Sequence, residues 1–287
     1  MNGKHIKQHL NRKIEDWLTS IDNEEVKNAI KDNVIVTGGA LVSLLTGDEV
    51  KDYDVYFKTR EALITVAKYY VDKWNKENPD KIASVAEDNS TRVRIFISSD
   101  GVAGKNVDTE ECEEYAGSSE KKPKEKSKDK YRPKFLTSNA ITLTDKIQVV
   151  VRFYGNVEEL HKNYDYVHCT CSWSYSNNEL ILPSRALEAI INKELYYMGS
   201  KYPLCSIFRA RKYINRGYTI NAGQYLKMAM QLNELNLKDI EVLKDQLMGV
   251  DSSYMSMLIN AIAEQKDKDE NFTIDSQYVI ELVNRIF

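Results

Sequence analysis

The stretch that decides the fold reads Val34-Ile35-Val36-Thr37-Gly38-Gly39 and then, after twelve residues, Asp52-Tyr53-Asp54-Val55-Tyr56. The apolar run before the glycines predicts a short strand. Residues 40–45 have a helical pattern that a following glycine can end, and residues 52–57 alternate as a second strand does. The order strand, Gly-Gly turn, helix, strand therefore forms the centre of the predicted domain.

The same stretch carries the residues best suited to chemistry. Two glycines between a strand and a helix let backbone N–H groups approach a phosphate closely. Asp52 and Asp54 alternate on a strand, so both carboxylates project from one face, about 7 Å apart. They repel each other unless a cation bridges them, and oxygen ligands suit Mg²⁺. This combination predicts phosphoryl or nucleotidyl transfer. The alternative is a plain tight turn beside a solvated strand.

Gly38-Gly39 followed by Asp52-Tyr53-Asp54 resembles the signature of the DNA polymerase β-like nucleotidyltransferase superfamily. That signature is a strand, Gly-Gly or Gly-Ser at a helix start, and Asp-x-Asp or Asp-x-Glu on the next strand. The resemblance implies an α+β fold, with a nucleotidyltransferase-type mixed sheet, flanking helices and a mostly helical C-terminal domain. It also implies transfer of a nucleoside monophosphate from an NTP to an acceptor hydroxyl, with Mg²⁺ or Mn²⁺ bound by Asp52 and Asp54.

A third carboxylate is usual in this superfamily, and it helps to activate the attacking hydroxyl. Asp165 is the candidate for this catalytic and metal-binding position, because it stands where a strand is expected to start. Asp145 is the second candidate, although it falls in an apparent turn. Gln148 lies on the strand where a carboxylate would otherwise be expected. If Gln148 occupies the third position, the metal site is weakened and catalysis is in doubt.

Phosphate-binding candidates come from two parts of the chain. Near the glycines they are Gly38, Gly39 and Ser43. In the C-terminal half they are Arg209, Lys212 and Arg216. The last three fall at i, i+3 and i+7 of a helix expected to begin at Ser206, which would place three cations on one face. Helical domains of this superfamily commonly hold the nucleotide, and this half is also similar to bacteriophage-encoded nucleotidyltransferase-like proteins. The alternative is an ordinary solvated helix face.

Two domains are expected, with residues 1–183 as the α/β core and residues 184–287 as a helical domain. Helical spacing predicts helices over residues 6–21, 24–31 and 61–76. Strand patterns occur at residues 82–86, 92–97, 135–143, 146–153, 164–174 and 179–182. Residues 100–133 nearly lack aromatic and β-branched side chains and join an acidic block to a lysine-rich one. We expect a mobile, charged insertion there, with a nucleic-acid or phosphate contact by its lysines as the alternative.

Composition narrows the class of protein. Hydrophobic residues make up 42% and charged residues 29% of the chain, and the net charge is −3. This is an ordinary globular balance without the basic field of a general nucleic-acid binder. The four cysteines lack zinc spacing and are expected to be buried thiols, and His168 is expected to be structural. Without a signal-peptide pattern or an apolar membrane span, we expect a cytoplasmic protein, or a virion-associated one if a phage encodes it.

Three functional hypotheses remain at this point. The first is the nucleotidyltransferase, with RNA, protein or a small molecule as acceptor. The second is a catalytically silent nucleotidyltransferase fold that serves as an assembly component of a larger particle or as a nucleic-acid-associated scaffold. The third is a toxin- or antitoxin-like transferase that modifies tRNA or a protein, and it differs from the first only in its acceptor.

Overall fold

The computed structural model describes residues 2–86, 93–97, 130–247, 261–262, 264–265, 268 and 275–286. The chain forms two compact units. The first consists of residues 1–101 and 125–198, and the second of residues 102–124 and 199–287. The helix α6 (Ser184–Asn192) therefore belongs with the first unit, whereas the sequence-based division at residue 183 places it in the helical domain.

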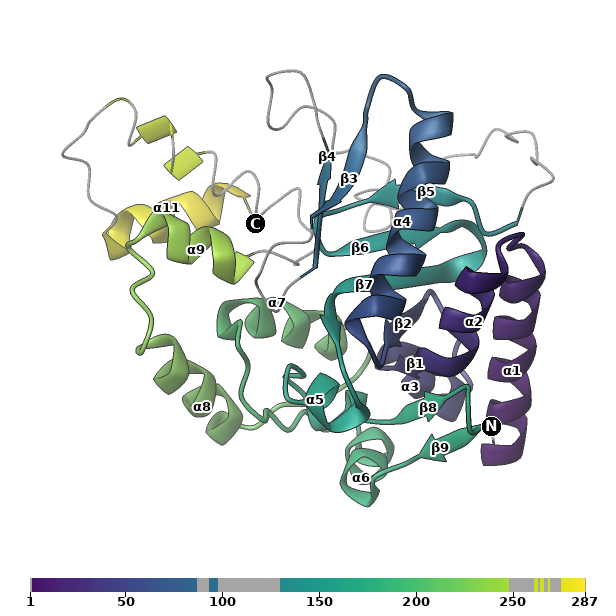
Figure 1. Cartoon of the computed structure of the whole chain (residues 1–287). Coiled ribbons are helices and arrows are strands. Elements are labelled where there is room, and N and C mark those ends of the chain that lie inside the picture. Colours follow the sequence, from purple (N-terminus) through teal and green to yellow (C-terminus); the bar gives the residue numbers. More distant parts are fainter. Residues whose placement is uncertain are drawn as a thin grey trace, which may run out of the picture. The chain divides into compact units, whose positions relative to one another are not determined.

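A seven-stranded mixed sheet forms the centre of the first unit, with the strand order β5-β6-β7-β2-β1-β8-β9 (Figure 1). The strands are β1 (Val34–Thr37), β2 (Tyr53–Phe57), β5 (Pro133–Leu136), β6 (Ala140–Leu143), β7 (Ile147–Tyr154), β8 (Ser172–Ser174) and β9 (Glu179–Ile181). Strands β2 and β7 run parallel, and the other neighbouring pairs of this sheet are antiparallel. The middle of the sheet therefore joins the two aspartates to a strand from much later in the chain.

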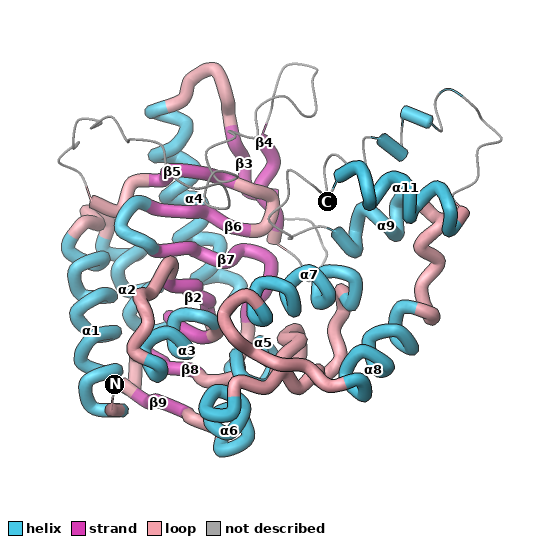
Figure 2. Tube along the Cα trace, turned by 180° about the vertical axis from the view of Figure 1, so that it is seen from behind, coloured by secondary structure: helices cyan, strands magenta, loops and turns pink. Residues whose placement is uncertain are grey.

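Helices cover both faces of this sheet (Figures 1 and 2). One face is covered by α1 (Gly3–Thr19), α2 (Glu24–Asn33) and α4 (Arg60–Glu77). The other face carries α3 (Gly39–Thr46) and α5 (Val157–His161). On the first face Trp17 of α1 donates its indole N–H to the hydroxyl of Tyr70 in α4, at 2.6 Å, and both side chains are buried. This hydrogen bond lets two large rings enter the core without an unsatisfied polar atom.

The architecture confirms the predicted α+β class and the order strand, Gly-Gly turn, helix, strand. Two strand predictions need correction. The expected strand over residues 164–174 is a 3₁₀ helix, η4 (Val167–Cys169), followed by the short β8, because Thr170 turns back and donates both its N–H and its hydroxyl to the Val167 carbonyl. The expected strand over residues 135–143 is two antiparallel strands, β5 and β6, because the chain turns between them and the Thr137 N–H binds the Ala140 carbonyl. The strands predicted over residues 82–86 and 92–97 are confirmed as β3 (Ala83–Ala86) and β4 (Arg94–Ile97), which pair with each other in a separate two-stranded sheet.

The charged segment expected over residues 100–133 lies mostly outside the described residues, which resume at Lys130. Its last residues belong to the folded core. Tyr131 is buried and donates its hydroxyl to Asp16 of α1 at 2.8 Å, and β5 begins at Pro133. Tyr131 fills a site in the core and hydrogen-bonds to a carboxylate. The folded core therefore resumes before residue 133, earlier than the lysine-rich composition suggests.

The described part of the second unit is helical. Its helices are α7 (Pro203–Ile214), α8 (Ala222–Leu232), α9 (Ile240–Leu247) and α11 (Ser276–Ile286). The side chain of Gln231 in α8 binds both the N–H and the carbonyl of Ser200, at 3.1 and 2.8 Å, which ties the start of this unit to that helix. Gln246 of α9 donates to the carbonyl of Lys201 at 3.1 Å and accepts the thiol hydrogen of Cys205 on its own carbonyl.

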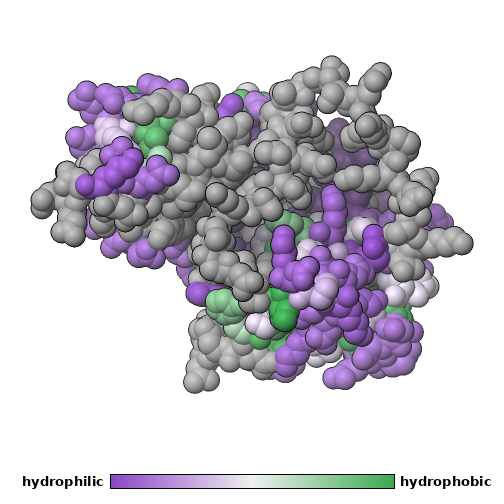
Figure 3. Space-filling model, turned by 90° about the horizontal axis from the view of Figure 1, so that it is seen from above, coloured by the Kyte–Doolittle hydropathy of each residue, from purple (hydrophilic) through white to green (hydrophobic). Residues whose placement is uncertain are grey.

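Several expectations about side chains are confirmed within the described residues. Cys169, Cys171 and Cys205 are free and buried, and His168 is fully buried. None of the described helices is long and apolar enough to cross a membrane. The surface visible in Figure 3 is mostly hydrophilic where it is coloured, with small hydrophobic patches.

Candidate functional site

The turn between β1 and α3 is built on Gly38. Its backbone has φ +85° and ψ −144°, in the region that favours glycine, and it is the N-cap of α3 without a side-chain cap. A Cβ atom at Gly38 would lie 3.4 Å from the hydroxyl oxygen of Tyr164 and 3.9 Å from Oδ2 of Asp54. Glycine therefore keeps this space open, and the carboxylate of Asp54 faces the start of α3.

The N-terminus of α3 presents backbone N–H groups at this point. The first residue of the helix to donate back along it is Leu41, whose N–H binds the carbonyl of Gly38 at 3.2 Å. The N–H groups before it have no intrahelical acceptor, and the helix dipole adds positive potential there. A phosphate at such a position is stabilised without a basic side chain.

The two predicted carboxylates differ in their surroundings. Asp54 lies inside β2 and is half-buried, whereas Asp52 precedes the strand and is exposed. The strand therefore starts one residue later than the alternation predicts. Because Asp52 and Asp54 are two residues apart, their carboxylates can still project from the same face. Asp54 then lies within the sheet and Asp52 in the solvent-exposed segment before it.

A row of polar side chains crosses the sheet on the face of Asp54. Gln148 of β7 is in register with Asp54, and Thr142 of β6 is in register with Gln148. On the other side the antiparallel register of β1 and β2 puts Thr37 opposite Asp54, and Ser172 of β8 is in register with Thr37. Residues in register project from the same face. We call Thr142, Gln148, Asp54, Thr37 and Ser172 the polar row.

Gln148 thus stands on the neighbouring parallel strand, beside Asp54. Its amide oxygen can accept a hydrogen bond or bind a cation, but it carries no charge and cannot act as a general base at neutral pH. Gln148 is therefore in the position beside Asp54 for which the sequence raised a weakened metal site, and that weakening stays a prediction.

The other two carboxylate candidates lie elsewhere. Asp165 is buried, with a relative exposure of 5%, and its carbonyl accepts the N–H of Met198 at 2.9 Å. Asp145 adopts a left-handed conformation, and its carboxylate accepts the N–H of Tyr131 at 3.3 Å. Nowhere in the described part of the chain do three carboxylate, imidazole or thiol side chains gather as a metal site. The metal-binding role of Asp165 stays a prediction.

A buried hydrogen-bond network is centred on Thr37, the residue before Gly38. Oγ1 of Thr37 lies 2.9 Å from Nε2 of His161 and 2.8 Å from the carbonyl oxygen of Cys171. The hydroxyl donates its one hydrogen to the carbonyl, so it accepts from an Nε2–H tautomer of His161. Burial lowers the pKa of His161 to about 4, which keeps the ring neutral as this arrangement requires. The hydroxyl of Thr37 is therefore satisfied by protein groups, among them His161 and the Cys171 carbonyl.

Tyr164 joins this network to the carboxylate. Its hydroxyl hydrogen-bonds with Tyr56 and Thr37, and burial, aided by Tyr56 and Asp54, raises its pKa well above the usual value. Neither Tyr164 nor His161 was singled out from the sequence, because nothing in their local pattern links them to a turn more than a hundred residues earlier.

The remaining phosphate-binding candidates are placed as follows. Gly39 begins α3, and Ser43 lies one turn further along it, half-buried. In the second unit, α7 starts at Pro203 and ends at Ile214, so the expected start at Ser206 is wrong. Proline suits the first helical turn because its missing N–H has no partner there.

The end of α7 at Ile214 reduces the number of predicted basic residues on one face of this helix. Arg209 and Lys212 lie on α7, but Arg216 lies beyond it, in the turn that Gly217 continues with φ +85°. The spacing i, i+3, i+7 therefore leaves two cations on one helix face instead of three. Their binding of phosphate stays a prediction.

The mixed sheet, the Gly-Gly turn at a helix start and the facing aspartate form the α+β arrangement that the sequence predicted. Within this α+β class, the chain belongs to the Gabija anti-defense 2 family, whose sequence model matches residues 8–193. It is 22% identical over 274 residues to "Gabija anti-defense 2" of Bacillus phage SPbetaL7, which covers 92% of this chain and 55% of the relative. The chain thus spans about half the length of the curated relative it matches.

Similar solved structures include two CCA-adding enzymes. The Thermotoga maritima enzyme complexed with tRNA is 11% identical with a TM-score of 0.40, over 87% of this chain and 53% of that one. The Bacillus stearothermophilus enzyme in complex with CTP is 13% identical with a TM-score of 0.39, over 86% and 51%. Scores this low assign neither residues nor an activity to this chain.

Proposed function

We propose that the chain is a nucleotidyltransferase, and that transfer of a nucleoside monophosphate from an NTP is how it exerts the anti-defence activity that its family is named for. The observation that carries the proposal is the position of Asp54, whose carboxylate oxygen lies 3.9 Å from where a Gly38 side chain would begin. A carboxylate beside an open helix N-terminus can share a cation with a phosphate chain.

Each residue has a defined task in this proposal. The backbone of Gly38 and Gly39, with Ser43 behind them, receives the phosphates at the start of α3. Asp52 and Asp54 supply only oxygen donors, which fits Mg²⁺ or Mn²⁺, and such an ion neutralises phosphate charge and orients the acceptor hydroxyl. The leaving group is pyrophosphate. No step is assigned to Asp165, and the acceptor is an RNA, a protein or a small molecule.

A second candidate function is a catalytically silent nucleotidyltransferase fold that acts by binding, as a component of a larger assembly. Gln148 favours it, because a neutral amide stands on the strand beside Asp54 and provides neither a third negative ligand nor a base. The two candidates differ in a single requirement, which is whether the carboxylate of Asp54 is needed.

Paired assays on the same variants separate them. Labelled NTPs are incubated with the protein, Mg²⁺ and cellular RNA or protein, and phage plating is measured on Gabija-carrying cells that express the chain. Asp54→Asn should abolish label transfer and anti-defence together, while Asp32→Asn, an exposed position on α2, should leave both unchanged. Anti-defence that survives Asp54→Asn would overturn the enzymatic proposal and favour the silent fold.

A further inference from the structure

An open pocket of about 610 Å³ lies in the first unit, between α1, the loop after α3 and the starts of β2 and β7. Tyr53 contributes to it from β2, and because side chains alternate along a strand, the pocket lies on the face opposite Asp54. Its size is in the range of small-molecule sites. Leu44, Val50 and Tyr53 provide apolar and aromatic surface in it.

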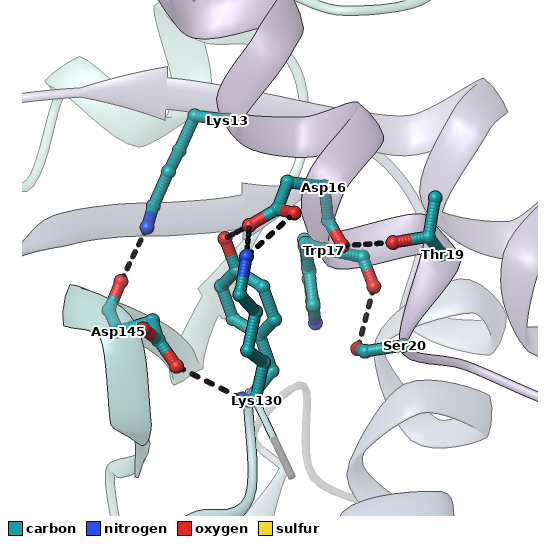
Figure 4. Close-up of polar contacts among 8 residues, drawn as sticks. Lys13, Asp16, Trp17, Thr19, Ser20, Lys130 and Asp145 are labelled. Atoms are coloured by element: carbon teal, nitrogen blue, oxygen red, sulfur yellow. Dashed lines mark hydrogen bonds and ion pairs between the residues drawn. The ribbon is translucent and has the colours of Figure 1, made fainter. Parts of the chain in front are cut away.

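The acidic side chains of this pocket already have partners. Asp16 accepts from Lys130 at 3.0 Å and from the Tyr131 hydroxyl at 2.8 Å (Figure 4). Glu49 pairs with Lys146 at 2.6 Å. Asp48 accepts the hydroxyl of a neighbouring threonine at 2.7 Å. These contacts occupy one lysine of the pocket and leave the basic groups on α1, among which His9 already has its Nε2 2.6 Å from the hydroxyl oxygen of Tyr53.

Those groups are His9, Arg12 and Lys13, which follow one another on the side of α1 that borders the pocket. Within the described residues none of the three forms an ion pair with a carboxylate. Lys13 makes its hydrogen bond and its ring contacts with neutral groups, and the carboxylates of Asp145 and Asp16 act on it without a direct ion pair. Figure 4 shows it reaching from α1 to the backbone carbonyl of Asp145, and its Nζ lies 5.4 and 4.9 Å from the ring centres of Tyr53 and Tyr131.

Such a half-buried ammonium lacks a full counter-charge. A carbonyl and two aromatic faces orient it, but they compensate only part of the hydration that burial removes. Burial accordingly lowers the pKa of Lys13, although Asp145 and Asp16 act in the opposite direction. The pKa of His9 is lowered by burial and by the neighbouring Lys13 and Arg12. An anion in the pocket would relieve both effects.

We propose that this pocket is a second ligand site, which binds a small phosphate-bearing molecule against Lys13, Arg12 and His9. Inorganic pyrophosphate and a free nucleotide share the required phosphate group. The rings and aliphatic side chains beside the cations leave room for a nucleoside, so a nucleotide gains contacts that pyrophosphate lacks. The site is independent of the carboxylates of Asp52 and Asp54 and requires no metal.

Calorimetric titration of the full chain with pyrophosphate and with ATP, in EDTA, tests the proposal. Without a divalent cation the unscreened carboxylate of Asp54 repels a phosphate at the glycine turn, so binding at that site is weakened. Wild type should bind both ligands, and the variant Asp54→Asn should bind them equally well. Loss of one cation–phosphate contact in Lys13→Gln should weaken binding about tenfold or more. Lys13→Arg should retain it, and so should Lys4→Gln, which removes an exposed lysine from the same helix outside the pocket.

Three results would overturn the second site. They are no binding of either ligand by wild type at millimolar concentration, equal affinity in wild type and Lys13→Gln, or an equal loss in Lys4→Gln. A circular dichroism melt of each variant checks that the fold is retained, and Lys13→Arg reports on the charge if Lys13→Gln does not fold. Loss of binding in Asp54→Asn alone would instead place the ligand at the proposed catalytic site.

Discussion

Asp54 and Gln148 occupy registered positions on the two parallel strands at the middle of the sheet, so a carboxylate and an amide stand side by side. The sheet places a neutral side chain where a third negative ligand would strengthen the hold on a cation. In the proposed site, the affinity for Mg²⁺ would then depend on two carboxylates, the waters of the ion and the phosphates of the nucleotide.

Replacing this amide tests its effect directly. In Gln148→Glu the added charge beside Asp54 should raise Mg²⁺ affinity about tenfold. In EDTA the same charge should lower the free energy of unfolding by about 1 kcal/mol, because two like charges then face each other without a cation. Calorimetric Mg²⁺ titration and urea unfolding measure the two effects. Unchanged Mg²⁺ affinity would show that the cation does not bind beside Asp54 and Gln148 in the polar row.

The glycine turn offers a matched pair of variants. Gly38→Ala forces a side chain into a left-handed conformation and 3.4 Å from the Tyr164 hydroxyl, so the free energy of unfolding should fall by about 1–2 kcal/mol. A Cβ atom at Gly39 meets nothing within 4 Å, so Gly39→Ala should be neutral or slightly stabilising. Equal losses in urea unfolding would contradict the conformation assigned to the turn.

The neutral ring of His161 makes stability depend on pH. Burial lowers its pKa in the folded protein to about 4, against about 6.5 when unfolded, so the unfolded chain binds more protons between these values. Its contribution is complete above about pH 6.5 and is lost as the pH falls toward 4. We expect a loss of about 1–2 kcal/mol, discounted because the ring is partly exposed.

Urea unfolding at pH 7 and pH 5 measures this contribution. The difference between the two pH values should shrink in His161→Gln and persist in His5→Gln, which alters an exposed histidine of α1. An unchanged difference in His161→Gln would assign the pH dependence to other groups.

Tyr164 is expected to position the carboxylate of the site. Tyr164→Phe removes the hydroxyl shared with Tyr56 and Thr37 and should cost about 1 kcal/mol of stability. If the Tyr164 side chain holds the Gly38 turn and Asp54 in position, its loss should raise the KM for the NTP and lower kcat in the transfer reaction. Tyr175→Phe changes another tyrosine of the same unit and should leave both constants unchanged. Normal kinetics in Tyr164→Phe would limit its role to packing.

The local signals of the sequence predicted the centre of the fold. Glycines that follow an apolar run and precede a helical pattern mark Gly38, and period-two alternation marks β2, because both features depend on neighbouring residues alone. The register that puts Gln148 beside Asp54, and the approach of Tyr164 and His161 to the turn, depend on long-range pairing. No local pattern encodes such pairing.

The misplaced elements have similarly physical causes. Arg216 fits a helical period, yet the helix ends before it at a glycine-containing turn. Tyr131 follows a lysine-rich run, yet its ring is buried and its hydroxyl finds Asp16. The basic pocket on α1 was not predicted, because the sequence of this helix has the ordinary amphipathic pattern, in which basic residues are expected on the solvent-exposed face.

The most direct measurement of the central claim is calorimetric titration of a non-hydrolysable ATP or GTP analogue, with and without Mg²⁺, into wild type and Asp54→Asn. We expect an Mg²⁺-dependent component of binding in wild type that Asp54→Asn loses and Asp32→Asn keeps. Binding unaffected by Mg²⁺, or an Mg²⁺-dependent component that survives in Asp54→Asn, would contradict a nucleotidyltransferase site at the glycine turn.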